Sequence, residues 1–116
     1  MTYEQALAMI ATEFELLGHA PHYRLIRTGL AYDGCNGFCV AIYNDNGELI
    51  LTDLGETKEV FDEISKEEWE MLCEAHGFRF RHWHIESPFE KMDDLYAFIQ
   101  FLDMISDQLF LYDSDD

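Results

Sequence analysis

The chain has 116 residues, of which 24 are acidic and seven are Lys or Arg, so its formal net charge is −17. Hydrophobic residues make up 48% and aromatic residues 15% of the sequence, which supports a folded core and excludes the usual disordered acidic tail. So negative a surface repels nucleic acid and anionic membranes, and it attracts basic protein surfaces.

The cysteine count and the N-terminal segment bear on the compartment. Three cysteines are an odd number, which argues against a closed disulfide framework and favours a reducing cytoplasm. The sequence has no basic and apolar leader and no long uncharged apolar run, so we expect a cytoplasmic protein without a membrane span. We expect residues 1–112 to form a single α+β domain, and residues 113–116 to form a disordered acidic tail.

The first third of the chain predicts a helix, a strand and a loop. Thr2-Tyr3-Glu4-Gln5 is a capping box, and apolar residues then recur at helical spacing as far as Leu17. This pattern predicts a helix that ends at Gly18. Residues 22–28 alternate loosely and predict a strand, and the glycines in residues 29–37 predict a loop.

A hairpin is the clearest local prediction. Two short β-prone runs, residues 38–43 and 48–53, flank an Asn-Gly pair at residues 46–47, which favours the positive φ angles of a tight turn. One face of this hairpin is apolar and should pack against the final helix; its residues are Val40, Ile42, Leu49 and Leu51.

The second half of the chain predicts three helices and one strand. A short helix with Val60, Phe61 and Ile64 inward should follow the hairpin. A second capping box, residues 65–68, should open a helix that stops at Gly77. Residues 78–85 alternate as a strand, and Ser87-Pro88 should begin a last helix that runs to about Tyr112. The expected buried stripe of that helix is Met92, Leu95, Ile99, Leu102, Ile105 and Leu109.

The expected fold class is α+β. Helices and strands are predicted in the order α-β-β-β-α-α-β-α. We therefore expect a small antiparallel sheet of three to four strands with a central hairpin, packed against helices that include a long C-terminal helix.

One segment carries a resemblance. Leu51-Thr52-Asp53-Leu54-Gly55-Glu56-Thr57, with Asp33 and the 38–43 strand before it, resembles a bacterial and prophage-associated family of unknown function. In that family a strand ends in a Leu-Thr-Asp-x-Gly-x-Thr segment that leads into a helix. The resemblance implies no activity, but it implies the context of small accessory proteins of phage, prophage and mobile elements. A structural interpretation stands beside it, in which Asp53 or Thr57 accepts backbone N–H groups at the helix start.

Cysteine and histidine residues provide the candidate metal ligands. Thiolate and imidazole together suit zinc, although no spacing here matches a Cys-x2-Cys knuckle. The candidate set is Cys35, Cys39, Cys73, His82 and His84. The same residues support an alternative function, a small zinc- or thiol-dependent enzyme or a metal-stabilised regulatory protein. The simpler interpretation of Cys39 and Cys73 is that they are buried small hydrophobic residues, and then no cofactor is bound.

The acidic residues provide the candidate partner-binding surface. Eleven acids lie in residues 45–74 and nine in residues 86–116. The acids predicted to meet a partner are Asp62, Glu63, Glu67, Glu70, Glu74, Asp93, Asp94, Asp103 and Asp107. Arg79 and Arg81 lie between these blocks and are expected to neutralise neighbouring acids.

The sequence therefore favours a binding protein over an enzyme. The first hypothesis is a phage or mobile-element protein that inhibits a host nucleic-acid-processing defence enzyme, of the anti-CRISPR or anti-restriction type. It would do so by occupying the enzyme's basic groove as a mimic of the DNA phosphate backbone. A regulatory or assembly subunit that forms a homodimer through an apolar patch is a further interpretation.

Overall fold

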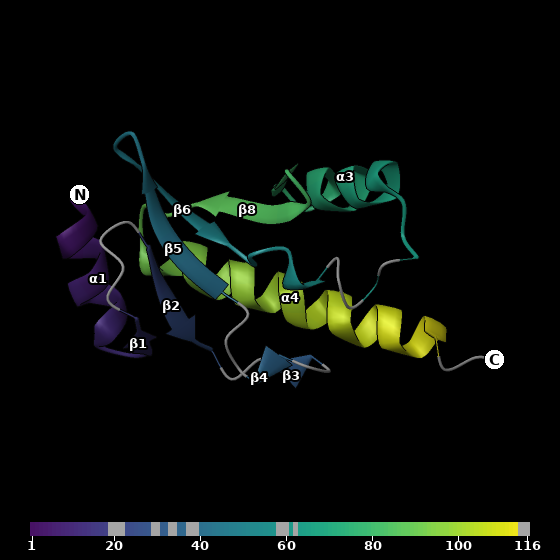
Figure 1. Cartoon of the computed structure of the whole chain (residues 1–116), viewed down its shortest axis with the longest axis horizontal. Helices are drawn as coiled ribbons and strands as arrows, with labels where there is room; N and C mark the ends of the chain where they lie inside the picture. Colours follow the sequence, from purple (N-terminus) through teal and green to yellow (C-terminus); the bar gives the residue numbers. More distant parts are fainter. Residues whose placement is uncertain are drawn as a thin grey trace.

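The computed structural model describes residues 1–18, 23–28, 31–32, 35–36, 40–57, 61 and 63–113. Within these residues the fold is α+β, with one six-stranded antiparallel sheet and three helices (Figure 1). The sheet contains β1 (Glu15–Leu17), β2 (Tyr23–Arg27), β5 (Val40–Asp45), β6 (Glu48–Thr52), β8 (His84–Pro88) and β7 (Arg79–Arg81), in that spatial order. Two short strands, β3 (Ala31–Tyr32) and β4 (Cys35–Asn36), pair with each other in a separate ladder.

The helices are α1 (Tyr3–Ala11), α3 (Lys66–Ala75) and α4 (Met92–Asp113). Figure 1 shows the long α4 running behind the sheet, α1 beside β1 and β2, and α3 near the start of β8. No helix in the described part of the chain is long and apolar enough to cross a membrane.

The hydrophobic core lies between one face of the sheet and the helices. Val40 and Ile42 of β5 and Leu49 and Leu51 of β6 belong to one buried cluster with α4, as the apolar alternation predicts. From α4, the fully buried residues of this cluster are Leu95, Phe98 and Leu102. Burying each of these side chains stabilises the fold by about 1.5–3 kcal/mol. The expected packing of the hairpin against the final helix is confirmed.

The sheet has six strands in the described chain, where three to four were expected. One added strand comes from the first predicted helix. That helix begins at its predicted capping box but ends at Ala11, and Glu15–Leu17 forms β1 instead. Leu16 lies opposite Ile26 of β2 and packs against the core. The helical spacing of the apolar residues was misleading because pairing with β2 lets Leu16 pack against the core from a strand.

Another added strand comes from residues 78–85, which form a hairpin rather than one strand. His82 and Trp83 make a two-residue turn with positive φ angles of 54° and 65°, and Arg81 lies opposite His84. Because neither turn residue is Gly or Asn, the sequence carries no turn signal there. The last helix also starts later than predicted. Pro88 ends β8 opposite Ile50, and α4 begins at Met92.

The other predictions for α3 and α4 are confirmed in part. Ser65 caps α3 by accepting the Glu68 amide at 3.2 Å, and Gly77 follows the helix with a φ of 82°. α4 buries Leu95, Leu102 and Ile105 as predicted, but Met92 and Ile99 are only partly buried, and Phe98 and Phe101 are buried instead. The helix extends through Asp113, the first residue of the expected tail. Val60 and residues 114–116 lie outside the described residues, and so does the side chain of Leu109.

Candidate functional site

The first candidate surface is an acidic stripe on α3. Glu67, Glu70 and Glu74 are exposed and three or four residues apart, so they share one face of the helix. The opposite face is fixed in the core by Trp69 and Cys73. Lys66 Nζ lies 3.8 Å from Glu70, but both side chains are about half exposed. An exposed ion pair of this kind contributes only about 0–1 kcal/mol to stability. Because this interaction is weak, Lys66 neutralises little of the negative charge of the α3 stripe.

The second surface is an acidic stripe on α4. Asp93, Asp103 and Asp107 are exposed, on the side of α4 away from its buried residues. Asp93 has a weak pair with Lys91, at 4.0 Å. Asp94 differs from these three because its Oδ2 accepts the amides of Glu90 at 2.8 Å and Lys91 at 3.1 Å. Its carboxylate therefore holds the start of α4.

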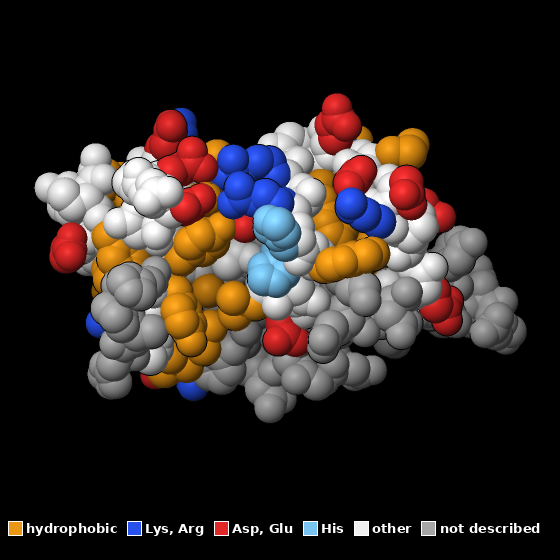
Figure 2. Space-filling view, turned by 45° about the horizontal axis from the view of Figure 1, so that its top comes forward, with side chains coloured by type: hydrophobic (Ala, Val, Ile, Leu, Met, Phe, Trp, Pro, Cys, Tyr) orange, Lys and Arg blue, Asp and Glu red, His pale blue; other side chains and the backbone are white. Residues whose placement is uncertain are grey.

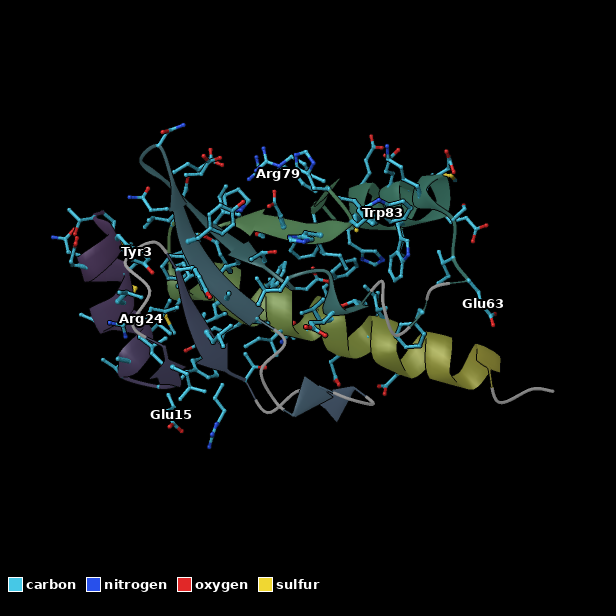
Figure 3. All side chains as sticks on the ribbon, in the orientation of Figure 1. Tyr3, Glu15, Arg24, Glu63, Arg79 and Trp83 are labelled. Atoms are coloured by element: carbon cyan, nitrogen blue, oxygen red, sulfur yellow. The ribbon has the colours of Figure 1, made fainter. Side chains whose placement is uncertain are left out.

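The two remaining predicted acids precede α3. Glu63 is exposed, and Figure 3 shows its side chain directed away from the sheet. Asp62 lies outside the described residues.

The predicted metal ligands are spread over several elements. Cys73 is a free thiol buried in the core, where burial and then the Asp53 carboxylate raise its pKa to about 12. Such a thiol holds its proton, whereas a zinc ligand or nucleophile must be a thiolate. His82 lies in the β7–β8 turn and His84 begins β8, so they do not share one continuous strand.

Among the described residues, no three His, Cys, Asp or Glu side chains are close enough together to hold a metal ion. Cys39 and the side chain of Cys35 lie outside the described residues. Zinc binding through the cysteine and histidine set therefore stays a prediction, and so does the enzyme alternative built on it.

The Leu51–Thr57 segment has a structural role that centres on Asp53. The Asp53 carboxylate is fully buried and accepts backbone N–H groups from Gly55 at 2.9 Å, from Ile85 at 2.9 Å and from Thr57 at 3.4 Å. Burial raises the pKa of Asp53, and these hydrogen bonds offset part of that rise. Asp53 thus joins the end of β6 to β8 and to the loop that follows β6.

His84 also depends on this loop. Leu54 and Gly55 have positive φ angles of 59° and 77°. A Cβ atom on Gly55 would lie 3.1 Å from the imidazole Cδ2 of His84. Glycine therefore lets the His84 ring lie close against the loop.

A third surface was not predicted, and it lies on the sheet face opposite the core, here called the open face. It carries a hollow of about 570 Å³ between β5 and the β7–β8 turn. Glu86 of β8 lines it and is only 4% exposed. Glu86 Oε2 accepts the Tyr43 hydroxyl at 2.6 Å, and burial together with this bond raises the pKa of Tyr43.

Arg81 lines the hollow, and Arg79 lies two residues before it on β7. Arg81 Nε lies 3.0 Å from Glu86 Oε1, and Arg81 Nη2 lies 3.8 Å from Asp45. Arg79 Nη2 contacts Glu48 at 2.9 Å. Both arginines neutralise neighbouring acids, as predicted. Figure 2 shows basic and histidine side chains gathered in the middle of one face. Figure 3 shows Arg79 near the β7–β8 hairpin.

A weak sequence signal could have indicated this surface. In a strand, alternate residues face the same side, so Ala41, Tyr43 and Asp45 must lie opposite the predicted core face of β5. On β8, Ile85 faces the core, so its neighbour Glu86 must lie on the opposite face of the sheet. What the sequence could not supply was the pairing that places Glu86 beside Arg79 and Thr52.

Comparison with models of protein families, with curated proteins and with solved structures finds no match. The resemblance of residues 51–57 to the prophage-associated family accordingly stays a prediction.

Proposed function

We propose that this protein is a binding protein whose acidic helices occupy the basic nucleic-acid groove of a partner enzyme and thereby inhibit it. The partner class is a nucleic-acid-processing defence enzyme, such as a CRISPR effector or a restriction enzyme, and the setting is the cytoplasm of a cell that carries a phage or mobile element. Neither nucleic acid nor a membrane is a direct ligand, because both are anionic.

One observation carries this proposal. Four acids of the α3 and α4 stripes are exposed and form no ion pair with a described residue: Glu67, Glu74, Asp103 and Asp107. The whole chain has a net charge of −17, so few basic side chains are available to neutralise them. A groove lined by lysine and arginine supplies the missing charge.

The spacing of the acids on α3, and of Asp103 and Asp107 on α4, supports the mimicry of a phosphate backbone. Acids three to four residues apart on a helix are separated by about 4.5–6 Å along the axis. One DNA strand carries about one phosphate per 3.4 Å of helix axis. The two spacings are of the same order, so a rigid helix can present carboxylates to lysines and arginines that normally bind phosphates.

The test is competition. The protein is immobilised and binding proteins are captured from a bacterial lysate at low salt. The captured protein is then purified and incubated with labelled duplex DNA or single-stranded RNA and increasing amounts of the acidic protein. We expect the acidic protein to displace the nucleic acid, and capture to weaken steeply as salt rises. Simultaneous binding of both ligands to the captured protein would exclude the mimic.

A further inference from the structure

The hollow on the open face contains a buried carboxylate with unused acceptor capacity. Glu86 is 4% exposed, and its Oε2 already accepts the Tyr43 hydroxyl. Its Oε1 is buried and accepts no hydrogen bond of good geometry from any described residue, although the Arg81 guanidinium is close. Buried carboxylate oxygens normally accept hydrogen bonds, and Oε1 has the Arg81 Nε beside it at 3.0 Å. An N–H donor that enters the hollow can therefore bind this oxygen when Arg81 turns away.

The charge of the hollow favours a cationic donor. Among the described residues that line the hollow, two carry a carboxylate, Glu86 and Asp45, and one carries a guanidinium, Arg81. The surrounding molecule is strongly negative, which further disfavours an anion. Arg81 shows how a guanidinium fits there, because it contacts both carboxylates and also donates to the Tyr43 hydroxyl at 3.3 Å.

The walls favour a planar cation over a compact one. Tyr23 and Tyr43 lie opposite each other on β2 and β5, and both line the hollow. Tyrosine faces attract cations, and a guanidinium stacks on them as well. A guanidinium also matches a carboxylate with paired N–H groups, which an ammonium cannot do.

Arg81 leaves room for a second cation. Its side chain is 43% exposed, so it has solvent into which to turn. Exposed side chains change rotamer within nanoseconds once their contacts break, so Arg81 can turn toward solvent when a ligand replaces it on Glu86 and Asp45.

We propose that the hollow receives one arginine side chain of the partner's basic groove, with its guanidinium on Glu86 and Asp45 and with Arg81 displaced toward solvent. This inference rests on the proposed function, and it identifies a contact away from the helical stripes at which the partner is held. Buried charge pairs of this kind determine how slowly a complex dissociates, whereas exposed stripes mainly determine how fast it forms.

The test uses the isolated protein, so its outcome is independent of any partner. The probe is N-acetyl-arginine amide, titrated while backbone amides are followed by NMR. The control ligand is N-acetyl-citrulline amide, which has nearly the same shape without the charge. We expect saturable shifts at Tyr43, His84 and Glu86 with a dissociation constant on the order of millimolar, and at least about tenfold weaker binding of citrulline.

Three variants locate the site. Glu86→Gln should weaken arginine binding at least about tenfold, and Arg81→Ala should tighten it because the competing internal guanidinium is gone. Glu4→Gln, in the first turn of α1 and outside both the stripes and the hollow, is the matched control and should leave arginine binding unchanged. If Glu86→Gln unfolds the protein, Arg81→Ala alone tests whether arginine binds in the hollow. This variant should fold, because the Arg81 side chain is exposed.

Several results would overturn the inference. These are shifts spread over α3 and α4 and insensitive to Glu86→Gln, equal binding of arginine and citrulline, or weaker binding by Arg81→Ala. Failure of the proposed function looks different. In that case arginine still binds at Glu86, but the acidic protein does not displace DNA or RNA from the captured protein.

Discussion

The conformation of the Leu51–Thr57 segment depends on Asp53. A buried carboxylate is normally destabilising, and here three backbone amides compensate for its loss of water. The same arrangement gives residues 51–57 a structural role. The amides of Gly55, Thr57 and Ile85 require an acceptor at this position, and few side chains could provide it.

Asp53→Asn should therefore destabilise the protein by about 1–3 kcal/mol, as measured by urea unfolding. The amide oxygen of asparagine can keep the bonds from Gly55 and Ile85, but its NH2 group would face the Thr57 amide, and two donors repel. The control is Asp103→Asn on exposed α4, which should change stability by less than about 0.5 kcal/mol. Equal stability of the two variants would show that the Asp53 network is not needed.

Cys73 should be chemically inert in the folded protein. Its thiol is buried and its pKa is raised to about 12, so almost no thiolate exists at pH 8. Brief alkylation followed by peptide mapping should leave Cys73 unmodified in buffer and modified in concentrated urea. Rapid modification of native Cys73 would instead indicate an accessible thiol of low pKa and would favour the alternative of a thiol-dependent enzyme.

At the scale of elements, helices and strands that depend on local signals could be predicted from the sequence, and those that depend on long-range pairing could not. The β5–β6 hairpin and α3 followed from an Asn-Gly turn and a Ser N-cap, which act within a few residues. β1 and the β7–β8 hairpin could not be predicted from local sequence signals. β1 forms through its pairing with β2. The β7–β8 turn places His82 and Trp83 at positive φ angles. Such angles are costly for these residues and persist only where the neighbouring structure requires them.

The α3 stripe should contribute to partner capture as an element. In Glu67→Lys/Glu74→Lys the fold should persist, because both side chains are exposed and neither forms an ion pair with a described residue. Capture of the partner at low salt should weaken by at least about tenfold, mainly through slower association measured by surface plasmon resonance.

The matched control for this variant is Glu4→Lys/Glu90→Lys. Glu4 lies in the first turn of α1 as Glu67 does in α3, so the cost to the helix is similar. Both variants carry the same net charge. If they weaken capture equally, total charge rather than the stripe attracts the partner.

At the scale of the whole molecule, the net charge of −17 has a consequence for stability as well as for partners. Like charges repel in the compact state, and dissolved salt screens them. The melting temperature should therefore rise by a few degrees between about 0.02 M and 0.5 M NaCl. The Glu67→Lys/Glu74→Lys variant should show a smaller rise. A melting temperature that is constant or falls with salt would show that local ion pairs outweigh the repulsion.

The sequence by itself determined the α+β class, the apolar face of the hairpin, the start of α3 and the exposed acidic stripes. These features depend on periodicity, capping and charge, which are properties of neighbouring residues. The candidate acids could be predicted for the same reason, since helical spacing alone places Glu67, Glu70 and Glu74 on one face.

Only the tertiary structure decided which strands are neighbours, and so which polar side chains meet. Glu86 is separated from Tyr43 by 43 positions along the chain, yet the two form a hydrogen bond on the open face. Two strands pair in one of several registers, and the choice depends on burying the opposite face against the helices. The hollow around Glu86 is a consequence of that choice, and no local pattern encodes it.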